Sequence, residues 1–283
     1  MKLKKDRPDG VDLHIHSVHS DGANTVDELI GIARERGLAA ISITDHDTLD
    51  AYPYAIEEGK RWGIEVIPGT ELSCEYKGTD IHILSYFLDY ENTELRQMLK
   101  NMRDARYFRA KKMVTTLNSL GVDLRFETVL RFSRGGAIGR PHIATALLHE
   151  EFVYSFREAF DKYIGYDSPA YVEKMHVTPE EIFSLVRRAG GVPILAHPGV
   201  TAVDDFLPEL VQQGLAGLEV YHSDHGKATR KRYAAFCKKH RLLFTGGSDF
   251  HCDMHRPGQS IVGDPYIRYS LLAGLKKRYA SFL

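Results

Sequence analysis

The sequence predicts an α/β protein with a parallel sheet, and three observations support this class. The chain has 283 residues, 43% of them hydrophobic, so it is long enough to bury a large core. Apolar runs typical of buried strands alternate with amphipathic helical patterns at short spacing. Histidines and carboxylates follow several of these runs, at the end of the sheet where such folds place their chemistry.

The first part of the chain is predicted to form four strands with helices between them. We expect the strands over residues 11–16, 39–44, 64–68 and 81–87. Thr25 and Glu28 have the spacing of a capping box, and the helix that follows them is expected to end near Gly37. A second helix is predicted over residues 48–62.

The pattern changes between residues 92 and 171, where no strand is predicted. Residues 93–120 form a long amphipathic pattern rich in Arg and Lys, followed by helical patterns over 126–132, 140–149 and 154–164. We therefore predict an all-helical, substrate-capping insertion over 96–171 within a main domain formed by 9–95 and 172–283. The basic residues of 100–112 are interpreted as a solvated helix face rather than a nucleic-acid patch.

Strand and helix alternate again in the last part of the chain. Thr178 and Glu181 repeat the capping-box spacing before a helix that is expected to run to Ala189. Strands are predicted over 191–196, 218–221 and 242–245, with helices over 204–213, 227–240 and 270–282.

Composition argues against several functional classes. The net charge of −1 gives no general polyanion-binding surface, so stable binding of duplex nucleic acid is not expected. The three scattered cysteines favour a reducing cytoplasm over a disulfide framework. No apolar run indicates a signal peptide or a membrane span. We expect a cytoplasmic protein that is a monomer or a weak dimer.

Histidine is the unusual component, because fourteen residues are about twice the number expected at an ordinary usage of roughly 2%. His14 and His16 would share one face of a strand and could form half of a metal site. Each candidate alone fits a loop hydrogen bond or a helix cap, but nine together indicate a multinuclear metal site. The predicted ligands are His14, His16, Asp21, His46, Glu71, His82, His197, Asp249 and His251.

The ligand types also bear on the metal. Nine ligands with one bridging carboxylate suit two or three divalent ions, and a site without thiolates favours Mn, Fe or Zn. We expect manganese first, with iron or zinc as alternatives. Cys74 and Cys252 lie near Glu71 and His251 but are interpreted as bystanders, because neighbouring residues of a strand point to opposite faces.

The segments that carry the predicted ligands resemble, in their order along the chain, the motifs of the PHP (polymerase and histidinol phosphatase) superfamily. The motifs are Asp12-Leu-His-Ile-His-Ser17 with Ser20-Asp-Gly22, Ile43-Thr-Asp-His-Asp47, Pro68-Gly-Thr-Glu-Leu-Ser73, Ile81-His-Ile-Leu84, Leu195-Ala-His-Pro-Gly199 and Gly247-Ser-Asp-Phe-His251. The chain is most similar to stand-alone, metal-dependent phosphoesterases of the TrpH type. In these proteins a helical insert carries a Gly-Arg-Pro-His segment, as in Gly139–His142.

The resemblance implies a distorted (β/α)7 barrel with a three-metal site. By this likeness, the first ion is held by His14, His16, Glu71 and Asp249. Glu71 bridges to a second ion held by His82 and His197, and the third ion is held by Asp21, His46 and His251. Metal-bound hydroxide would attack phosphorus in line. Asp45, His46 and Glu71 are the predicted catalytic residues, and Asp45 is either a proton-relay residue or a strand-end cap.

Phosphate recognition is expected from guanidinium groups of the insertion. Arg140, between Gly139 and Pro141, is the first candidate, and Arg134 is the second. His142 and His222 are further substrate-binding candidates, and for His222 a structural role in a loop is the alternative.

The resemblance implies an enzyme that hydrolyses phosphate esters of nucleotides. The expected reactions are removal of the 3′-phosphate from nucleoside 3′,5′-bisphosphates, trimming of short oligonucleotides in the 5′–3′ direction, or both. One alternative is a small-metabolite phosphomonoesterase of the histidinol-phosphatase kind, which the helical insert disfavours. The other is a non-catalytic accessory module, which the complete ligand set disfavours.

Overall fold

The computed structural model describes residues 9–201, 203–252 and 260–280, and it contains two β-sheets. The four-stranded sheet has the order β3-β2-β1-β9, and the five-stranded sheet has the order β4-β5-β6-β7-β8. The strands are β1 (Gly10–Ile15), β2 (Leu38–Ile43), β3 (Glu65–Val66), β4 (Gly69–Tyr76), β5 (Thr79–Tyr86), β6 (Val192–Leu195), β7 (Gly217–Tyr221), β8 (Leu243–Gly246) and β9 (Ile267–Arg268).

The α/β class is confirmed, but the described strands do not form the closed barrel that was predicted. The two sheets meet at two seams through isolated parallel bridges, one from His46 to Glu71 and one from Ile15 to Phe250. Regular pairing stops there because Asp47 and Asp249 have φ values of 52° and 54°, which cannot continue a strand. Both seams lie where predicted metal ligands are concentrated.

The prediction of a parallel sheet also needs correction, because both sheets are mixed. Pairs β1–β2, β2–β3, β6–β7 and β7–β8 are parallel, whereas β1–β9, β4–β5 and β5–β6 are antiparallel. Strand β4 was missed because Pro68-Gly69 is typical of a turn. Lys77 and Gly78 join β4 to β5 with positive φ values, as in a tight hairpin. Glu71 therefore lies within a strand rather than after one.

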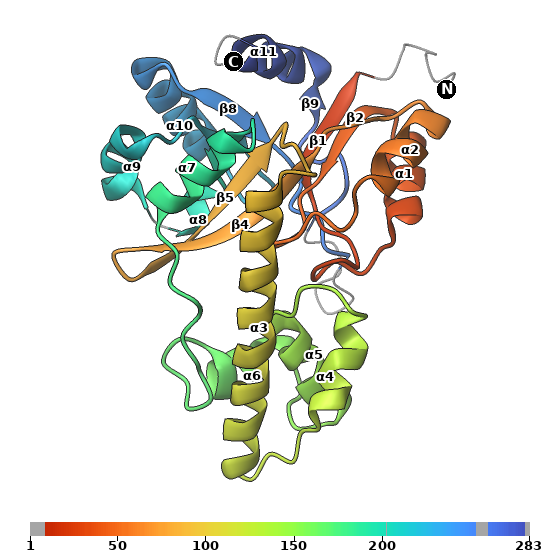
Figure 1. The fold of residues 1–283 in the computed structure, drawn as a ribbon, viewed down its shortest axis with the longest axis vertical. Coiled ribbons are helices and arrows are strands. Elements are labelled where there is room, and N and C mark those ends of the chain that lie inside the picture. The colour runs from red at the N-terminus through yellow and green to blue at the C-terminus, as the bar shows by residue number, and fades with distance from the viewer. Residues whose placement is uncertain (1–8, 202, 253–259, 281–283) are drawn as a thin grey trace.

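Helices pack around the two sheets in the upper part of Figure 1. They are α1 (Val26–Glu35), α2 (Tyr54–Trp62), α7 (Pro179–Arg188), α8 (Pro198–Thr201), η2 (Asp204–Phe206), α9 (Leu207–Gln213), α10 (Lys227–His240) and α11 (Tyr269–Tyr279). The capping boxes at Thr25 and Thr178 are confirmed. Helix α2 begins at Tyr54 rather than at residue 48, directly after Pro53, whose fixed φ suits the start of a helix.

The described residues between β5 and α7 form helices and no strand. These helices are α3 (Thr93–Ser119), α4 (Phe126–Ser133), α5 (Arg140–His149), α6 (Phe156–Ala159) and the π-helix η1 (Phe160–Ile164). Figure 1 shows α3 leaving the sheets, with α4–α6 beside its far half. Leu99 and Met102 of α3 pack in the main core, while Met113 and Leu117 belong to a separate core. The division of the chain at residues 96 and 171 stays a prediction.

In the part of the chain that the structure describes, no helix is both long enough and apolar enough to span a bilayer.

Candidate metal centre

The structure brings all nine predicted ligand side chains into one cluster at the seams between the sheets. They come from β1 and the loop after it, the turn after β2, strands β4 and β5, and the segments after β6 and β8. Each has an N or O atom within 3.8 Å of another member of the cluster. The predicted residues therefore meet, and their roles as metal ligands stay predictions.

Four of the nine side chains form a compact group. The Nε2 atoms of His14 and His16 lie 3.1 Å apart, and both face Glu71 Oε2 and Asp249 Oδ1 at 3.1–3.3 Å. Ligand atoms about 3.3 Å apart at the corners of a tetrahedron lie about 2.0 Å from its centre, which is the Zn–N distance found in proteins. The one N–N and four N–O distances given above are of this size, so the four side chains suit one divalent ion.

Hydrogen bonds select the ring nitrogens that face the cluster. His14 Nδ1 lies 3.0 Å from Glu219 Oε1 and donates its proton there, so Nε2 is free to act as a ligand. His251 Nδ1 is in the same way 3.0 Å from the backbone oxygen of Asp249, and its Nε2 faces Asp21. An outer hydrogen bond that fixes the tautomer is the usual arrangement for a histidine that binds a metal.

Glu71 connects this group to a second one. Its Oε2 atom belongs to the compact group, whereas its Oε1 atom lies 2.9 Å from His82 Nδ1 and 3.0 Å from His197 Nε2. The side chain is only 1% exposed. One carboxylate with its two oxygens directed at different histidines has the geometry of a ligand that bridges two ions.

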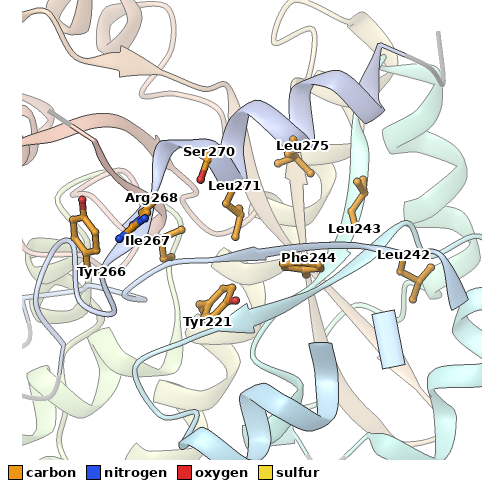
Figure 2. A pocket seen from close by; sticks show the side chains of 11 residues that line it. Tyr221, Leu242, Leu243, Phe244, Tyr266, Ile267, Arg268, Ser270, Leu271 and Leu275 are labelled. Atoms are coloured by element: carbon orange, nitrogen blue, oxygen red, sulfur yellow. The ribbon is translucent and has the colours of Figure 1, made fainter. Parts of the chain in front are cut away.

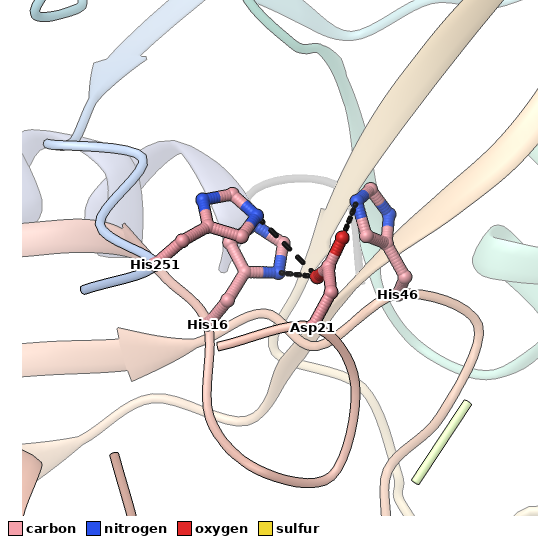
Figure 3. Close-up of side chains that lie close together, drawn as sticks. All are labelled: His16, Asp21, His46 and His251. Atoms are coloured by element: carbon pink, nitrogen blue, oxygen red, sulfur yellow. Dashed lines mark ion pairs between the residues drawn. The ribbon is translucent and has the colours of Figure 1, made fainter. Parts of the chain in front are cut away.

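The third group is wider and surrounds Asp21 (Figure 3). Asp21 Oδ1 lies 3.4 Å from His251 Nε2 and 3.7 Å from His16 Nδ1, and Oδ2 lies 3.8 Å from His46 Nε2. Asp21 Oδ1 is buried without a hydrogen-bond partner, and so is His46 Nδ1, which faces Glu71 Oε2 at 3.3 Å rather than Asp21. Because an unsatisfied buried polar atom costs about 1–3 kcal/mol, Asp21 Oδ1 fits a site that receives a cation.

The pKa shifts reflect the density of charge in the cluster. Burial alone would raise the pKa of Glu71, but nearby histidines, His46 first, hold it well below its ordinary value. Burial alone would lower the pKa of His14, but Glu219 and Asp249 raise it well above its ordinary value. The carboxylates therefore stay ionised and attract either protons or metal ions to the histidines.

Asp45 lies beside the cluster rather than in it. Its Oδ1 atom accepts hydrogen bonds from Ser17 N and Ser20 Oγ at 2.7 and 2.6 Å, and its Oδ2 accepts from Ser17 Oγ at 2.6 Å. Ser20 Oγ is in turn 3.5 Å from His16 Nδ1. Asp45 thus holds the loop that carries Asp21, and its catalytic role stays a prediction.

The cluster opens into a cavity of about 210 Å³ between the sheets and the helices. Asp21, His46 and His82 line one part of it, and Arg140 lines another. The Arg140 guanidinium lies 4.6 Å from the ring centre of Tyr166, in a cation–π contact.

The other predicted substrate-binding residues are not among those that line this cavity. Arg134 Nη1 donates to the backbone oxygen of Ala23 at 3.3 Å. His142 is buried and accepts a hydrogen bond from Gly139 N. His222 Nε2 lies 3.4 Å from Asp249 Oδ2 and is buried behind the cluster. Their roles in substrate binding stay predictions.

Three basic side chains that line the cavity were not predicted: Arg106, Arg109 and Lys174. Arg106 Nη2 pairs with Asp47 Oδ2 at 2.6 Å and donates to Ser73 Oγ at 2.9 Å. The interpretation of 100–112 as a solvated face is thus wrong for two arginines of α3. Arg106 and Arg109 are three positions apart, which places them on the same face of the helix. This spacing was the feature of the sequence that could have indicated their shared location.

Arg109 is held by one end of its guanidinium only. Its Nε donates to the backbone oxygen of Val172 at 2.7 Å, while Nη2 is buried without a hydrogen-bond partner. Burial, with the charge of Arg140 next, lowers the pKa of Arg109. A buried cation with an unused donor, close to a second cation, favours binding of an anion between them.

A second cavity, of about 530 Å³, lies between β8 and α11 (Figure 2). Its lining is mainly apolar, with Phe244, Leu271 and Leu275 among its residues, and it shares no residue with the ligand cluster. The smaller cavity is therefore the candidate active site, because Asp21, His46 and His82 of the ligand cluster line it.

The PHP domain model matches residues 12–182. The chain is 30% identical to the phosphoribosyl 1,2-cyclic phosphate 1,2-diphosphodiesterase of Eggerthella lenta, over 85% of this chain and 93% of the relative. It is 31% identical to the 3′,5′-nucleoside bisphosphate phosphatase of Chromobacterium violaceum, over 85% and 87%. It is 32% identical to the 5′-3′ exoribonuclease Rnm of Salmonella typhimurium, over 85% and 84%.

Solved structures also resemble this chain over most of its length. A Bifidobacterium adolescentis protein assigned as a metal-dependent phosphoesterase superposes with a TM-score of 0.85 at 31% identity, over 95% of this chain and 96% of that one. An amidohydrolase from Chromobacterium violaceum, solved with sulfate and without metal, has a TM-score of 0.80 at 30% identity, over 89% of both chains. The family expected from the sequence motifs is confirmed: this chain belongs to the PHP family.

Proposed function

We propose that this protein is a metal-dependent phosphoesterase that hydrolyses phosphate esters of nucleotides or short oligonucleotides. One observation carries the proposal. A single cavity is lined at one part by Asp21, His46 and His82 of the ligand cluster and at another by basic side chains of α3, α5 and the chain before α7. Such a cavity can hold a phosphoester at the cluster while it binds a second phosphate.

The chemistry of the ligand cluster fits divalent cations. His14, His16, Glu71 and Asp249 would hold one ion, and Glu71 with His82 and His197 would hold a second. Asp21, His46 and His251, beside His16, would hold a third. Ions bound there would lower the pKa of a water molecule and neutralise charge on a phosphoryl group. Manganese, iron and zinc all suit these ligands.

The side chains of the cavity supply binding and orientation. Arg109 Nη2 has an unused donor, and Arg140 is fixed against the Tyr166 ring. Lys174 is paired with Asp80, and Arg140 Nη2 lies 4.0 Å from the same carboxylate, so Asp80 partly neutralises both charges. We assign Arg109 and Arg140 to the second phosphate, because two fixed guanidinium groups match the oxygens of a phosphate better than a single flexible ammonium does.

Two phosphates on one substrate agree with the relatives named as a nucleoside bisphosphate phosphatase and an exoribonuclease. The relative named as a cyclic phosphate diphosphodiesterase is equally similar, so the substrate has to be tested across classes. A small-metabolite monoester carries one phosphate, so the basic side chains of the cavity would have no second phosphate to bind. A non-catalytic accessory module would not explain why one cavity joins the ligand cluster to these basic side chains.

The test is a hydrolysis assay on purified protein loaded with Mn²⁺, with an EDTA-treated sample as control. The substrates are adenosine 3′,5′-bisphosphate, a 5′-phosphorylated trinucleotide, phosphoribosyl 1,2-cyclic phosphate and histidinol phosphate. We expect metal-dependent release of phosphate or mononucleotide from the first two. Absence of turnover of the first two by metal-loaded protein would refute the proposal, whether or not the other two are hydrolysed.

A further inference from the structure

Strand β7 contributes none of the nine predicted metal ligands, yet it directs a carboxylate at the cluster. Glu219 lies in the middle of this strand and is completely buried, with 0% of its side chain exposed. A fully buried carboxylate is costly unless it is paired and hydrogen-bonded. Its contacts therefore indicate what the residue does.

Each oxygen of Glu219 is used by a different predicted ligand. Oε1 accepts the proton of His14 Nδ1 at 3.0 Å, and Oε2 accepts a hydrogen bond from the backbone N–H of His197 at 2.9 Å. These two histidines belong to different groups of the cluster, because His14 faces Glu71 Oε2 whereas His197 faces Glu71 Oε1.

The backbone of His197 shows why such a contact is needed. Its φ value is 27°, in a region that residues other than glycine rarely adopt and that costs about 1–3 kcal/mol. Such a conformation persists only when the surrounding contacts fix it. The hydrogen bond from His197 N to Glu219 is one of these contacts, and the imidazole that it fixes lies 3.0 Å from the bridging Glu71.

We propose that Glu219 is a positioning residue for the metal centre, an inference that rests on the metal dependence of the proposed function. Through Oε1 it keeps the proton of His14 on Nδ1, so that Nε2 presents its lone pair to the first ion. Through Oε2 it holds the His197 backbone so that the imidazole reaches the second ion. One buried carboxylate thus sets ligand atoms for two adjacent ions from behind the cluster.

Direct coordination by Glu219 is the alternative, because its oxygen lies close to His14 and His222 in a group that could hold an ion. The hydrogen bonds argue against it. Both carboxylate oxygens already accept N–H donors, from His14 and from His197. An ion at Glu219 would have to displace the proton of His14 Nδ1 and would leave Nε2 without its fixed tautomer.

The test is Zn²⁺ binding by Glu219→Gln, measured by competition with a chromophoric chelator, together with the visible spectrum of the Co²⁺-substituted protein. The amide can accept only one of the two hydrogen bonds and presents an N–H₂ group to the other donor. We expect the Zn²⁺ affinity to fall about 10- to 100-fold, as for other outer-layer partners of metal-binding histidines, and the Co²⁺ spectrum to change.

Glu209→Gln is the matched control, because it removes the same charge from a half-exposed glutamate on α9 that pairs with Lys77. It should leave both readouts at their wild-type values. A purely structural role for Glu219 would lower the melting temperature equally with and without metal. A positioning role reduces the increase in melting temperature that the metal produces.

Wild-type Zn²⁺ affinity and a wild-type Co²⁺ spectrum in Glu219→Gln would overturn the proposal. If that variant does not fold, Glu219→Asp is measured, because it keeps the charge but is too short to reach both donors. We expect it to fold and to bind Zn²⁺ weakly. Failure of both variants to fold in saturating Zn²⁺ would also overturn the proposal, because Glu219 would then be required for the fold itself. No readout uses a substrate, so the result is independent of whether any phosphoester is hydrolysed.

Discussion

The Nε2 atoms of His14 and His16 lie 3.1 Å apart and are directed at the same two carboxylate oxygens. Two nitrogens with lone pairs cannot approach this closely without a proton or a cation between them. We therefore expect the double variant His14→Ala, His16→Ala to lose at least one bound metal ion and essentially all hydrolytic activity.

Metal content of this variant is measured by elemental analysis after dialysis, and folding by circular dichroism. Full metal occupancy in the folded double variant would contradict the assignment of these histidines as ligands. Cys252→Ser is a suitable companion variant. It should retain all of its metal, because Cys252 is an exposed free cysteine that belongs to none of the groups of the ligand cluster.

Arg109→Ala should weaken substrate binding. A hydrogen bond to a charged group contributes about 1.5–3 kcal/mol, so KM for adenosine 3′,5′-bisphosphate should rise roughly 10- to 100-fold. Arg103→Ala is the control, because Arg103 lies on the same helix but pairs with Asp50 at the surface. Its KM should change less than about 2-fold. Equal KM values for the two variants would remove Arg109 from the substrate site.

Asp47→Asn should destabilise the protein, because it leaves the Arg106 guanidinium largely buried without its carboxylate partner. Removing one partner of a buried ion pair costs about 3–5 kcal/mol. Chemical denaturation of metal-free protein measures the loss. The double variant Asp47→Asn, Arg106→Met should recover part of it, since both charges are then gone. Additive losses would show that the two residues are not coupled.

Metal binding should release protons. Burial alone would lower the pKa of His251, but Asp21 and Asp249 raise it to about 10, so the metal-free residue is protonated at pH 8. The pKa of His14 is raised well above its ordinary value by Glu219 and Asp249. A metal ion requires the unprotonated nitrogen, so metal affinity should fall as the pH is lowered.

Calorimetric titration with Mn²⁺ in two buffers of different ionisation enthalpy gives the number of protons released. We expect net release at pH 8. Zero release or net uptake of protons would show that these histidines are already unprotonated before the metal binds.

Much of the candidate site could be predicted from the sequence, because most of its predicted ligands occur at or just after strand ends, where local pattern and position in the fold are linked. His14 and His16 share a strand face by simple periodicity, and Asp249 and His251 follow an apolar run. Glu71 was predicted as a ligand through its motif. Its position within β4 was not predicted, because Pro68-Gly69 resembles a turn.

Residues whose roles depend on tertiary packing could not be predicted. Phe108 of α3 is 66% exposed while Arg106 on the same helix is largely buried, so apolar periodicity does not show which face meets the cavity. Glu219 is a single carboxylate in an apolar strand, and only its contacts with His14 and His197 reveal its function. The prediction of a closed barrel was wrong because positive φ values at the seams interrupt strand pairing.

The central claim is that one cavity holds a phosphoester at a metal cluster and a second phosphate at the arginines. The most direct measurement is a crystal structure with Mn²⁺, adenosine 5′-monophosphate and inorganic phosphate, in which anomalous scattering locates the ions. We predict manganese peaks bounded by Glu71, Asp21 and Asp249, one phosphate at the ions and another between Arg109 and Arg140. Manganese outside the cluster, or no phosphate between the two arginines, would contradict the account.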